Sequence, residues 1–135
     1  MNFYQTKSPL LAGSNYKEIH RSYEKYFRSL QSKSKRQPYV RSAYFLKQKI
    51  FLNLIWLHLF DKTHNVRSIR LKYLPSAIEL LENSRNHPIT IQNLDAKAEL
   101  FHRFSGITRD KKKFVVQVKQ VKRTGKLYFM SVYPI

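Results

Sequence analysis

Two segments near the end of the chain restrict the fold more than any other feature. In Lys113–Val121 and Lys126–Tyr133, apolar and polar residues alternate, and a short turn separates the segments. Alternation with a period of two is typical of a β-strand that buries one face. The turn contains Gly125, which can adopt the left-handed conformation that closes a three-residue hairpin loop. We therefore expect an antiparallel hairpin with Lys122 opposite Lys126.

This register predicts two different faces for the hairpin. The apolar face carries Val116, Val118, Tyr128, Met130 and Val132, and suits packing against helices. The polar face carries Gln117, Lys119, Phe129, Ser131 and Tyr133. With Lys119 opposite Phe129 and Gln117 opposite Ser131, the polar face combines aromatic rings with groups that can bind phosphate.

A third strand, about Glu99–Ile107, precedes the hairpin and carries His102. If Asp110 and Lys111 form a two-residue turn, Lys119 lies opposite His102 and the imidazole joins the polar face. A one-residue change in that loop would turn His102 toward the core and bring Arg103 and Ser105 to the polar face instead. Both His102 and Arg103 are candidates, and we prefer His102.

The preceding part of the chain has the periodicity of helices. Helices are expected over residues 16–31, 42–62 and 66–83, the last of them interrupted by Pro75, which predicts a kink or the start of a second helix. A short strand is expected at Ile89–Ile91.

These elements predict a single α+β domain. It consists of a flexible arm over residues 1–14, a helical part over 15–84, and a sheet over 88–135. The helices are expected to pack on one face of a three- to four-stranded antiparallel sheet.

The charge of the chain predicts a polyanionic partner. Lys and Arg number 26 and Asp and Glu number 8, a net charge of +18, which is typical of proteins that bind phosphate backbones. Besides Gln117, Phe129 and Tyr133, the residues expected to contact RNA lie in the turns and just before the sheet: Arg109, Lys111, Lys112, Lys113, Lys122, Arg123 and Arg85.

Several classes of protein are disfavoured. The acidic residues are scattered and cysteine is absent, so we expect no metal site, and the common cofactor motifs do not occur. The most apolar run, Ile50–Phe60, is too short to span a bilayer. We therefore expect a cytoplasmic protein that needs no cofactor and does not act on membranes.

The polar residues suit either cleavage or binding of RNA. Metal-free cleavage needs one group that takes the 2′ proton, another that protonates the leaving oxygen, and cations beside the phosphate. His102, Lys119, Arg103, Ser131 and Tyr133 are residues of these types. The alternative is a non-catalytic RNA- or DNA-binding module that stacks bases on Phe129 and Tyr133. A weaker alternative is DNA binding by the basic faces of the first and third helices.

A resemblance favours cleavage. The histidine strand with Gly106, the strand FVVQVK and the strand YFMSVYP resemble the C-terminal core of the phage-type members of the barnase/EndoU/colicin/RelE-like nuclease superfamily. The resemblance covers about the last third of the chain, and Lys111 stands where the first hairpin of the family usually has glycine. It implies helices followed by a four-stranded antiparallel sheet, and active-site roles for His102, Lys119, Ser131 and Arg103.

The function expected from this resemblance is a metal-independent endoribonuclease acting on tRNA or other structured RNA. In several branches such proteins are toxins. A toxin of phage or mobile-element origin would have an antitoxin or immunity protein as a further partner.

Overall fold

The long strands at the end of the chain form the centre of the sheet. In the computed structural model, which describes residues 2–31, 37–60 and 62–135, β5 (Glu99–Ile107), β6 (Lys113–Val121) and β7 (Leu127–Pro134) pair antiparallel in chain order. The short strand β4 (Ile89–Gln92) pairs antiparallel with β5. The strands predicted in this part of the chain are thus confirmed.

The complete sheet is larger and more mixed than predicted. Strand β1 (Tyr4–Gln5) runs parallel to β5, and β3 (Lys49–Phe51) runs parallel to β7 and antiparallel to β2 (Tyr39–Arg41). Among the described residues the order is β1-β5-β6-β7-β3-β2, with β4 also on β5, which makes seven strands. The prediction of a three- to four-stranded antiparallel sheet is therefore wrong. The added strands β1, β2 and β3 have two or three residues each, too few to show a period of two.

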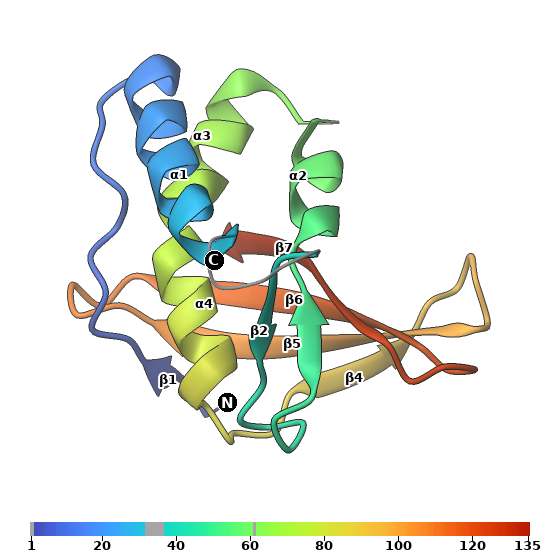
Figure 1. Cartoon of the computed structure of the whole chain (residues 1–135). Coiled ribbons are helices and arrows are strands. Elements are labelled where there is room, and N and C mark those ends of the chain that lie inside the picture. The colour runs from blue at the N-terminus through green and yellow to red at the C-terminus, as the bar shows by residue number, and fades with distance from the viewer. Residues whose placement is uncertain (1, 32–36, 61) are drawn as a thin grey trace.

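The helices lie on one side of the long strands (Figure 1). They are α1 (Tyr16–Gln31), α2 (Asn53–Phe60), α3 (His64–Lys72) and α4 (Leu74–Asn83). The first predicted helix is confirmed. The predicted break is also confirmed, because Pro75 lies in the first turn of α4, where its missing N–H leaves no hydrogen bond unmade.

The central helix predicted over residues 42–62 is wrong in its first half. There the chain forms the β2–β3 hairpin and its turn, and helix begins only at Asn53. The apolar pattern of this predicted helix includes Ile50. Ile50 is instead fully buried in β3, where it pairs with Leu127 of β7. The predicted helix also included Asp61, which lies outside the described residues.

The segment predicted to be a flexible arm is attached to the domain. The Thr6 N–H donates to the Ile107 carbonyl at 2.9 Å, and the Leu11 N–H donates to the Lys72 carbonyl at 3.0 Å. Between these two bonds, the carboxylate of Glu79 accepts hydrogen bonds from the arm. The arm therefore contributes β1 to the sheet and then crosses to the helices (Figure 1).

The core fills the space between the helices and the inner side of the sheet. Phe104, Val116, Val118, Phe129 and Val132 are buried in one cluster with residues from all four helices.

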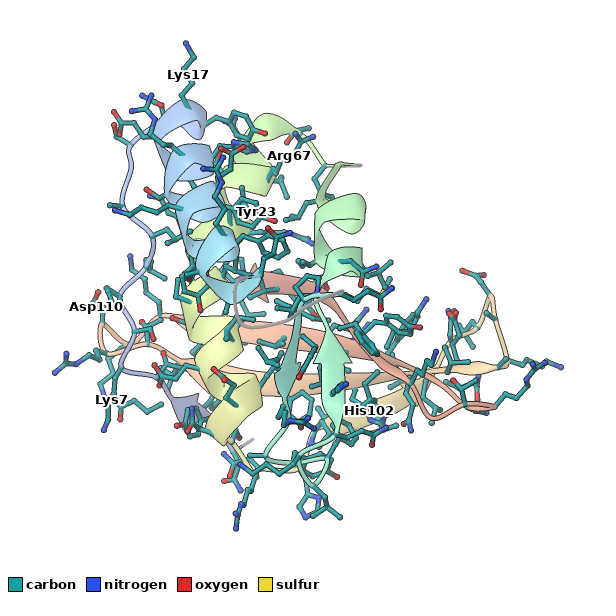
Figure 2. All side chains as sticks on the ribbon, viewed as in Figure 1. Lys7, Lys17, Tyr23, Arg67, His102 and Asp110 are labelled. Atoms are coloured by element: carbon teal, nitrogen blue, oxygen red, sulfur yellow. The ribbon has the colours of Figure 1, made fainter. Side chains whose placement is uncertain are left out.

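Arg67 of α3 joins three helices at the edge of this core (Figure 2). Its Nε donates to the carbonyl of Leu59 and one terminal nitrogen donates to the carbonyl of Lys62, each at 3.1 Å. The other terminal nitrogen donates to the hydroxyl of Tyr16, also at 3.1 Å. The Leu59 carbonyl also accepts the Lys62 N–H at 3.0 Å, so the arginine adds hydrogen bonds to the turn that follows α2 and connects it to α1 and α3.

Candidate nucleic-acid interface

The first turn decides which side of the sheet His102 faces. The loop has three residues, Arg109–Lys111, and is closed by a hydrogen bond from the Thr108 N–H to the Lys112 carbonyl at 2.9 Å. Lys111 has φ of 67°, the left-handed conformation in which hairpins of this length usually place glycine. The loop is therefore one residue longer than predicted, and the register of β5 against β6 changes with it.

In this register Lys119 pairs with Phe101, and His102 pairs with Val118 on the inner side. The preferred prediction, that His102 shares a face with Lys119 and Ser131, is wrong. The other alternative, with Arg103 and Ser105 on the outer side, is the arrangement in the structure.

The second turn is also longer than predicted. Gly125 has φ of 72°, which confirms its left-handed conformation. However, the Gly125 N–H donates to the Val121 carbonyl, and the Val121 N–H donates to the Lys126 carbonyl, so the loop runs from Lys122 to Gly125. The predicted pairing of Lys122 with Lys126 is therefore displaced by one residue.

A β-bulge in β7 corrects this displacement. Met130 is the extra residue of the bulge, and beyond it Gln117 pairs with Ser131, as predicted. On the hairpin side of the bulge the faces are exchanged. Phe129 is fully buried in the core, and Tyr128 lies on the outer side. The bulge inverts the alternation of inward and outward side chains between Met130 and the turn. The prediction that Phe129 stacks bases is therefore wrong, and so is the prediction that Tyr128 lies on the apolar face.

We call the outer side of β5, β6 and β7 the outward face. Its cross-strand rows are Ser105–Val115–Tyr133, Arg103–Gln117–Ser131 and Phe101–Lys119–Tyr128. Arg103 is exposed, whereas Gln117 and Ser131 are buried, at 8% and 3% relative exposure. The structure thus brings Arg103, Gln117, Lys119 and Ser131 to one face, but Ser131 has little surface left to contact a ligand. Tyr133 pairs with Val115 at the edge of this face, but its ring lies 5.4 Å from the guanidinium of Arg70 and lines a cleft with residues of α3.

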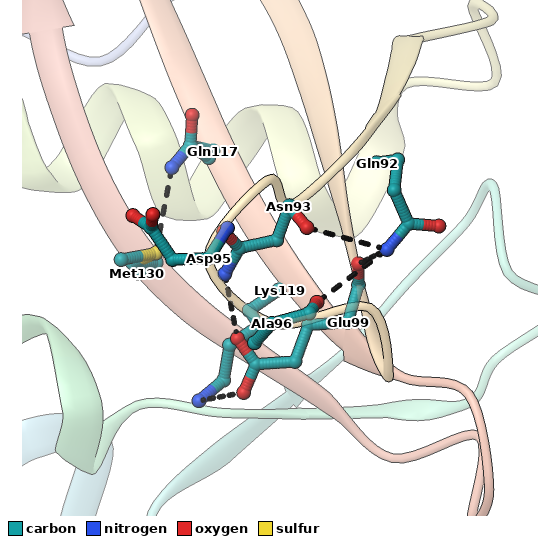
Figure 3. Close-up of polar contacts among 8 residues, drawn as sticks. All are labelled: Gln92, Asn93, Asp95, Ala96, Glu99, Gln117, Lys119 and Met130. Atoms are coloured by element: carbon teal, nitrogen blue, oxygen red, sulfur yellow. Dashed lines mark hydrogen bonds and ion pairs between the residues drawn. The ribbon is translucent and has the colours of Figure 1, made fainter.

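Arg103 is held in the middle of this face. Its Nε donates to Oε1 of Gln117 at 2.8 Å, and Nε2 of Gln117 in turn donates to Sδ of Met130 at 3.4 Å (Figure 3). Among the residues that the structure describes, Arg103 forms no ion pair with a carboxylate. Its positive charge is therefore uncompensated, and the end of its guanidinium faces solvent.

Lys119 has a carboxylate partner. Its Nζ lies 3.3 Å from Oε2 of Glu99, and Oε1 of Glu99 accepts a hydrogen bond from Nδ2 of Asn93 at 2.9 Å (Figure 3). The same ammonium lies 5.5 Å from the centre of the Tyr128 ring. Sequence reasoning missed Glu99, Asn93 and Tyr128. The alternation Glu99, Phe101, Arg103 along β5 would have indicated Glu99, had the register been known.

The two turns extend the positive charge beyond both ends of the outward face. Exposed basic side chains lie in and beside the first turn and in the second turn: Arg109, Lys111, Lys112, Lys113, Lys122 and Arg123. The nine residues of β6, which separate the turns, span roughly 30 Å at about 3.3 Å per residue. Lys122 also donates to Oε1 of Gln92 and so connects the second turn to β4.

Arg85, predicted to contact RNA with these residues, lies elsewhere. It lines a cleft together with Tyr44, whose ring packs against Phe104 of the inner side. The structure therefore does not bring Arg85 to the outward face.

His102 is enclosed on the inner side, beside the β2–β3 hairpin (Figure 2). Its relative exposure is 7%. Nε2 lies 2.7 Å from Oε1 of Gln120 and Nδ1 lies 2.8 Å from the hydroxyl of Thr90, while the ring of Phe45 packs at 5.0 Å between centroids. Because a carbonyl oxygen only accepts, Nε2 carries the proton. Both ring nitrogens are thus engaged within the protein, away from Arg103 and Lys119.

Two further observations concern metals and membranes. Among the side chains that the structure describes, no three from His, Asp or Glu lie close enough together to hold a metal ion. No helix in the described part of the chain combines the length and apolarity needed to cross a membrane.

A scan against protein-family models, a search of curated proteins and a search of solved structures each found no match to the chain.

Proposed function

We propose that this protein binds RNA through its outward face. The observation that carries the proposal is Arg103, an exposed arginine at the centre of a sheet, positioned by Gln117 and without a carboxylate partner among the described residues. A guanidinium presents its N–H donors in a planar fork that matches two phosphate oxygens. Since Nε is already bonded to Gln117, the two terminal nitrogens are the groups that would contact a phosphate.

The surroundings of Arg103 support a nucleic acid over a small anion. Tyr128 supplies a half-buried aromatic ring beside Lys119 on the same face, and bases of single-stranded RNA stack on such rings. The basic turns at both ends of β6 add positive charge along the path of a strand. RNA with unpaired loops suits this face best because its bases can turn toward the sheet. We propose structured RNA such as tRNA as the ligand.

Arg103→Gln is expected to weaken tRNA binding by about tenfold, because a charged hydrogen-bond donor to phosphate is lost. Binding is measured by fluorescence anisotropy over a series of salt concentrations. The slope of log K against log salt should fall by about one for Arg103→Gln. The matched control is Lys17→Gln, which removes an exposed charge from α1, on the helical side of the molecule (Figure 2). Equal losses in the two variants would contradict a role for Arg103 beyond net charge.

We also propose that the protein cleaves RNA without a metal ion, and the position of Glu99 supports this second function. Its carboxylate lies beside the ammonium of Lys119 on the outward face, so a base and a cation are adjacent. In this scheme Glu99 takes the 2′ proton of bound RNA, and the 2′ oxygen forms a bond to phosphorus. The bond from phosphorus to the 5′ oxygen then breaks, and the leaving oxygen takes a proton from the ammonium of Lys119, while Arg103 stabilises the negative charge of the phosphorane. His102 takes no part in the reaction.

The cleavage scheme predicts different results for two isosteric or near-isosteric changes. Labelled tRNA is incubated with the protein in EDTA and its fragments are separated on a gel. Glu99→Gln should lower the cleavage rate by about a hundredfold or more, the usual contribution of a general base. His102→Gln should retain cleavage in the fraction that folds, which circular dichroism measures. Binding without cleavage by the unaltered protein would leave RNA binding alone as the function.

A further inference from the structure

A separate cleft lies between the turn of the β2–β3 hairpin and the loop that follows α4. It has a volume of about 440 Å³ and is lined by Ala43, Tyr44, Leu46, Lys47 and Arg85. Small-molecule sites commonly fall between about 300 and 1,000 Å³. The cleft lies on the inner side of the sheet, because Tyr44 packs against Phe104, and it is therefore distinct from the outward face.

The turn that forms one wall holds an unfavourable backbone conformation. Leu46 and Lys47 have φ of 54° and 69°, although residues with a Cβ atom avoid positive φ and such turns favour Asn-Gly. Ser42 stabilises the turn, since its carbonyl accepts the Lys47 N–H at 2.7 Å and its hydroxyl accepts the Phe45 N–H at 2.9 Å. The side chain of Leu46 is left 91% exposed. Strain of this kind is found where a protein presents side chains to a ligand.

Tyr44 forms a rigid aromatic wall. Its ring contacts Phe45 at 4.9 Å, Phe104 at 5.6 Å and His87 at 5.6 Å between centroids. Its hydroxyl lies 3.3 Å from Nδ1 of His87. A ring fixed by three neighbours loses little conformational entropy when a planar group packs against it.

Two positive charges complete the cleft. Lys47 and Arg85 are both exposed, and neither forms an ion pair in the part of the chain that the structure describes. They come from segments separated by α2, α3 and α4, yet they line one cleft. An arginine and a lysine without carboxylate partners form a site suited to phosphate.

We propose that this cleft binds a nucleotide unit. The base packs against Tyr44 and Leu46, and the phosphate lies between Lys47 and Arg85. A nucleotide accounts for the aromatic wall and for the cations together, whereas an inorganic anion accounts only for the cations. The unit can come from a free nucleotide or from an RNA strand. The site does not depend on RNA binding by the outward face, because the two sites share no residue.

The test is a titration of the full chain with adenosine 5′-monophosphate, followed by ¹H–¹⁵N NMR. The nucleotide should shift the amide signals of residues 43–48 and 85–87 and leave those of 103 and 117–119 unchanged. Inorganic phosphate at the same ionic strength should bind at least tenfold more weakly, because it lacks the base. Shifts confined to the outward face, or equal binding of inorganic phosphate, would overturn the proposal.

Two variants connect the binding to the cleft. Lys47→Asn removes the charge while keeping a residue that tolerates positive φ, so the turn is preserved. Together with Arg85→Gln, it should weaken binding about tenfold per substitution. The control Lys97→Gln removes an exposed lysine from the loop between β4 and β5 and should leave binding unchanged. Arg103→Gln should also leave it unchanged, which separates this proposal from the one for the outward face.

A short single-stranded oligoribonucleotide distinguishes the sources of the ligand. If it shifts the cleft signals at lower concentration than the mononucleotide, the site receives a nucleotide of RNA. If only the mononucleotide shifts them, the ligand is a free nucleotide. If neither ligand shifts them at millimolar concentration, the cleft is not a nucleotide site.

Discussion

Gly106→Ala is expected to lower the free energy of unfolding by about 2–3 kcal/mol, the cost of overpacking a close-packed core. Gly106 of β5 pairs directly with Phe114 of β6, whose ring covers it. A Cβ atom on residue 106 would lie 2.3 Å from Cζ of that ring. Phe114 is fully buried and its ring packs on Tyr73 at 5.6 Å between centroids, so the ring has no room to move aside.

Urea unfolding of a double-mutant cycle measures this clash. Phe114→Leu alone should destabilise the protein, because a buried ring is replaced by a smaller side chain. In the double variant the leucine leaves room for the methyl group that Gly106→Ala introduces. The combined loss should therefore be smaller than the sum of the single losses by at least about 1 kcal/mol, as for other residues in contact. Additive losses would show that the added methyl group and the Phe114 ring do not compete for the same space.

Glu79→Gln is expected to detach the N-terminal arm. The carboxylate of Glu79 in α4 accepts the Lys7 N–H at 2.9 Å, the Ser8 N–H at 2.8 Å and the Ser8 hydroxyl at 2.6 Å. Hydrogen bonds to a charged acceptor are about twice as strong as neutral ones. Glutamine keeps one acceptor oxygen and turns an NH₂ group toward the donors of the arm. The free energy of unfolding should fall by about 2 kcal/mol.

Release of the arm has its own measurement. Trypsin should cleave after Lys7 faster in Glu79→Gln than in the unaltered protein, because cleavage requires the segment to leave the helix. Glu82→Gln is the matched control, since Glu82 lies on the same helix, is exposed and, within the described residues, forms no hydrogen bond with the arm. Equal cleavage rates in the two variants would show that β1 pairing alone holds the arm.

The arm also reaches the first turn of the sheet. Lys7, Ser8, Leu10, Arg109 and Asp110 line one small cleft, and Figure 2 shows Lys7 and Asp110 at the same end of the molecule. The arm thus lies across a cleft from the loop whose length sets the register of β5 against β6. Detaching it in Glu79→Gln should therefore alter the mobility of that loop.

The sequence by itself determined the elements whose signals are local. Strands β4 to β7 follow from alternation over several residues, α1 follows from apolar residues at helical spacing, and the start of α4 follows from the geometry of Pro75. For the candidate site, the sequence identified Arg103, Gln117, Lys119 and Tyr133 as members of one polar face in one of its two registers.

Only the tertiary structure decided the rest. Strands β1, β2 and β3 are too short for any periodicity. β1 forms on an open edge of β5, β3 forms on the open edge of β7, and β2 pairs with β3. The bulge at Met130 places Tyr128 outside and Phe129 in the core, and it leaves no local mark in the sequence. The choice between His102 and Arg103 depended on one residue of loop length. A glycine at position 111 would have predicted a left-handed residue and hence a three-residue loop. Lys111 adopts this conformation without being glycine, so the residues of the loop did not indicate that Arg103 faces outward.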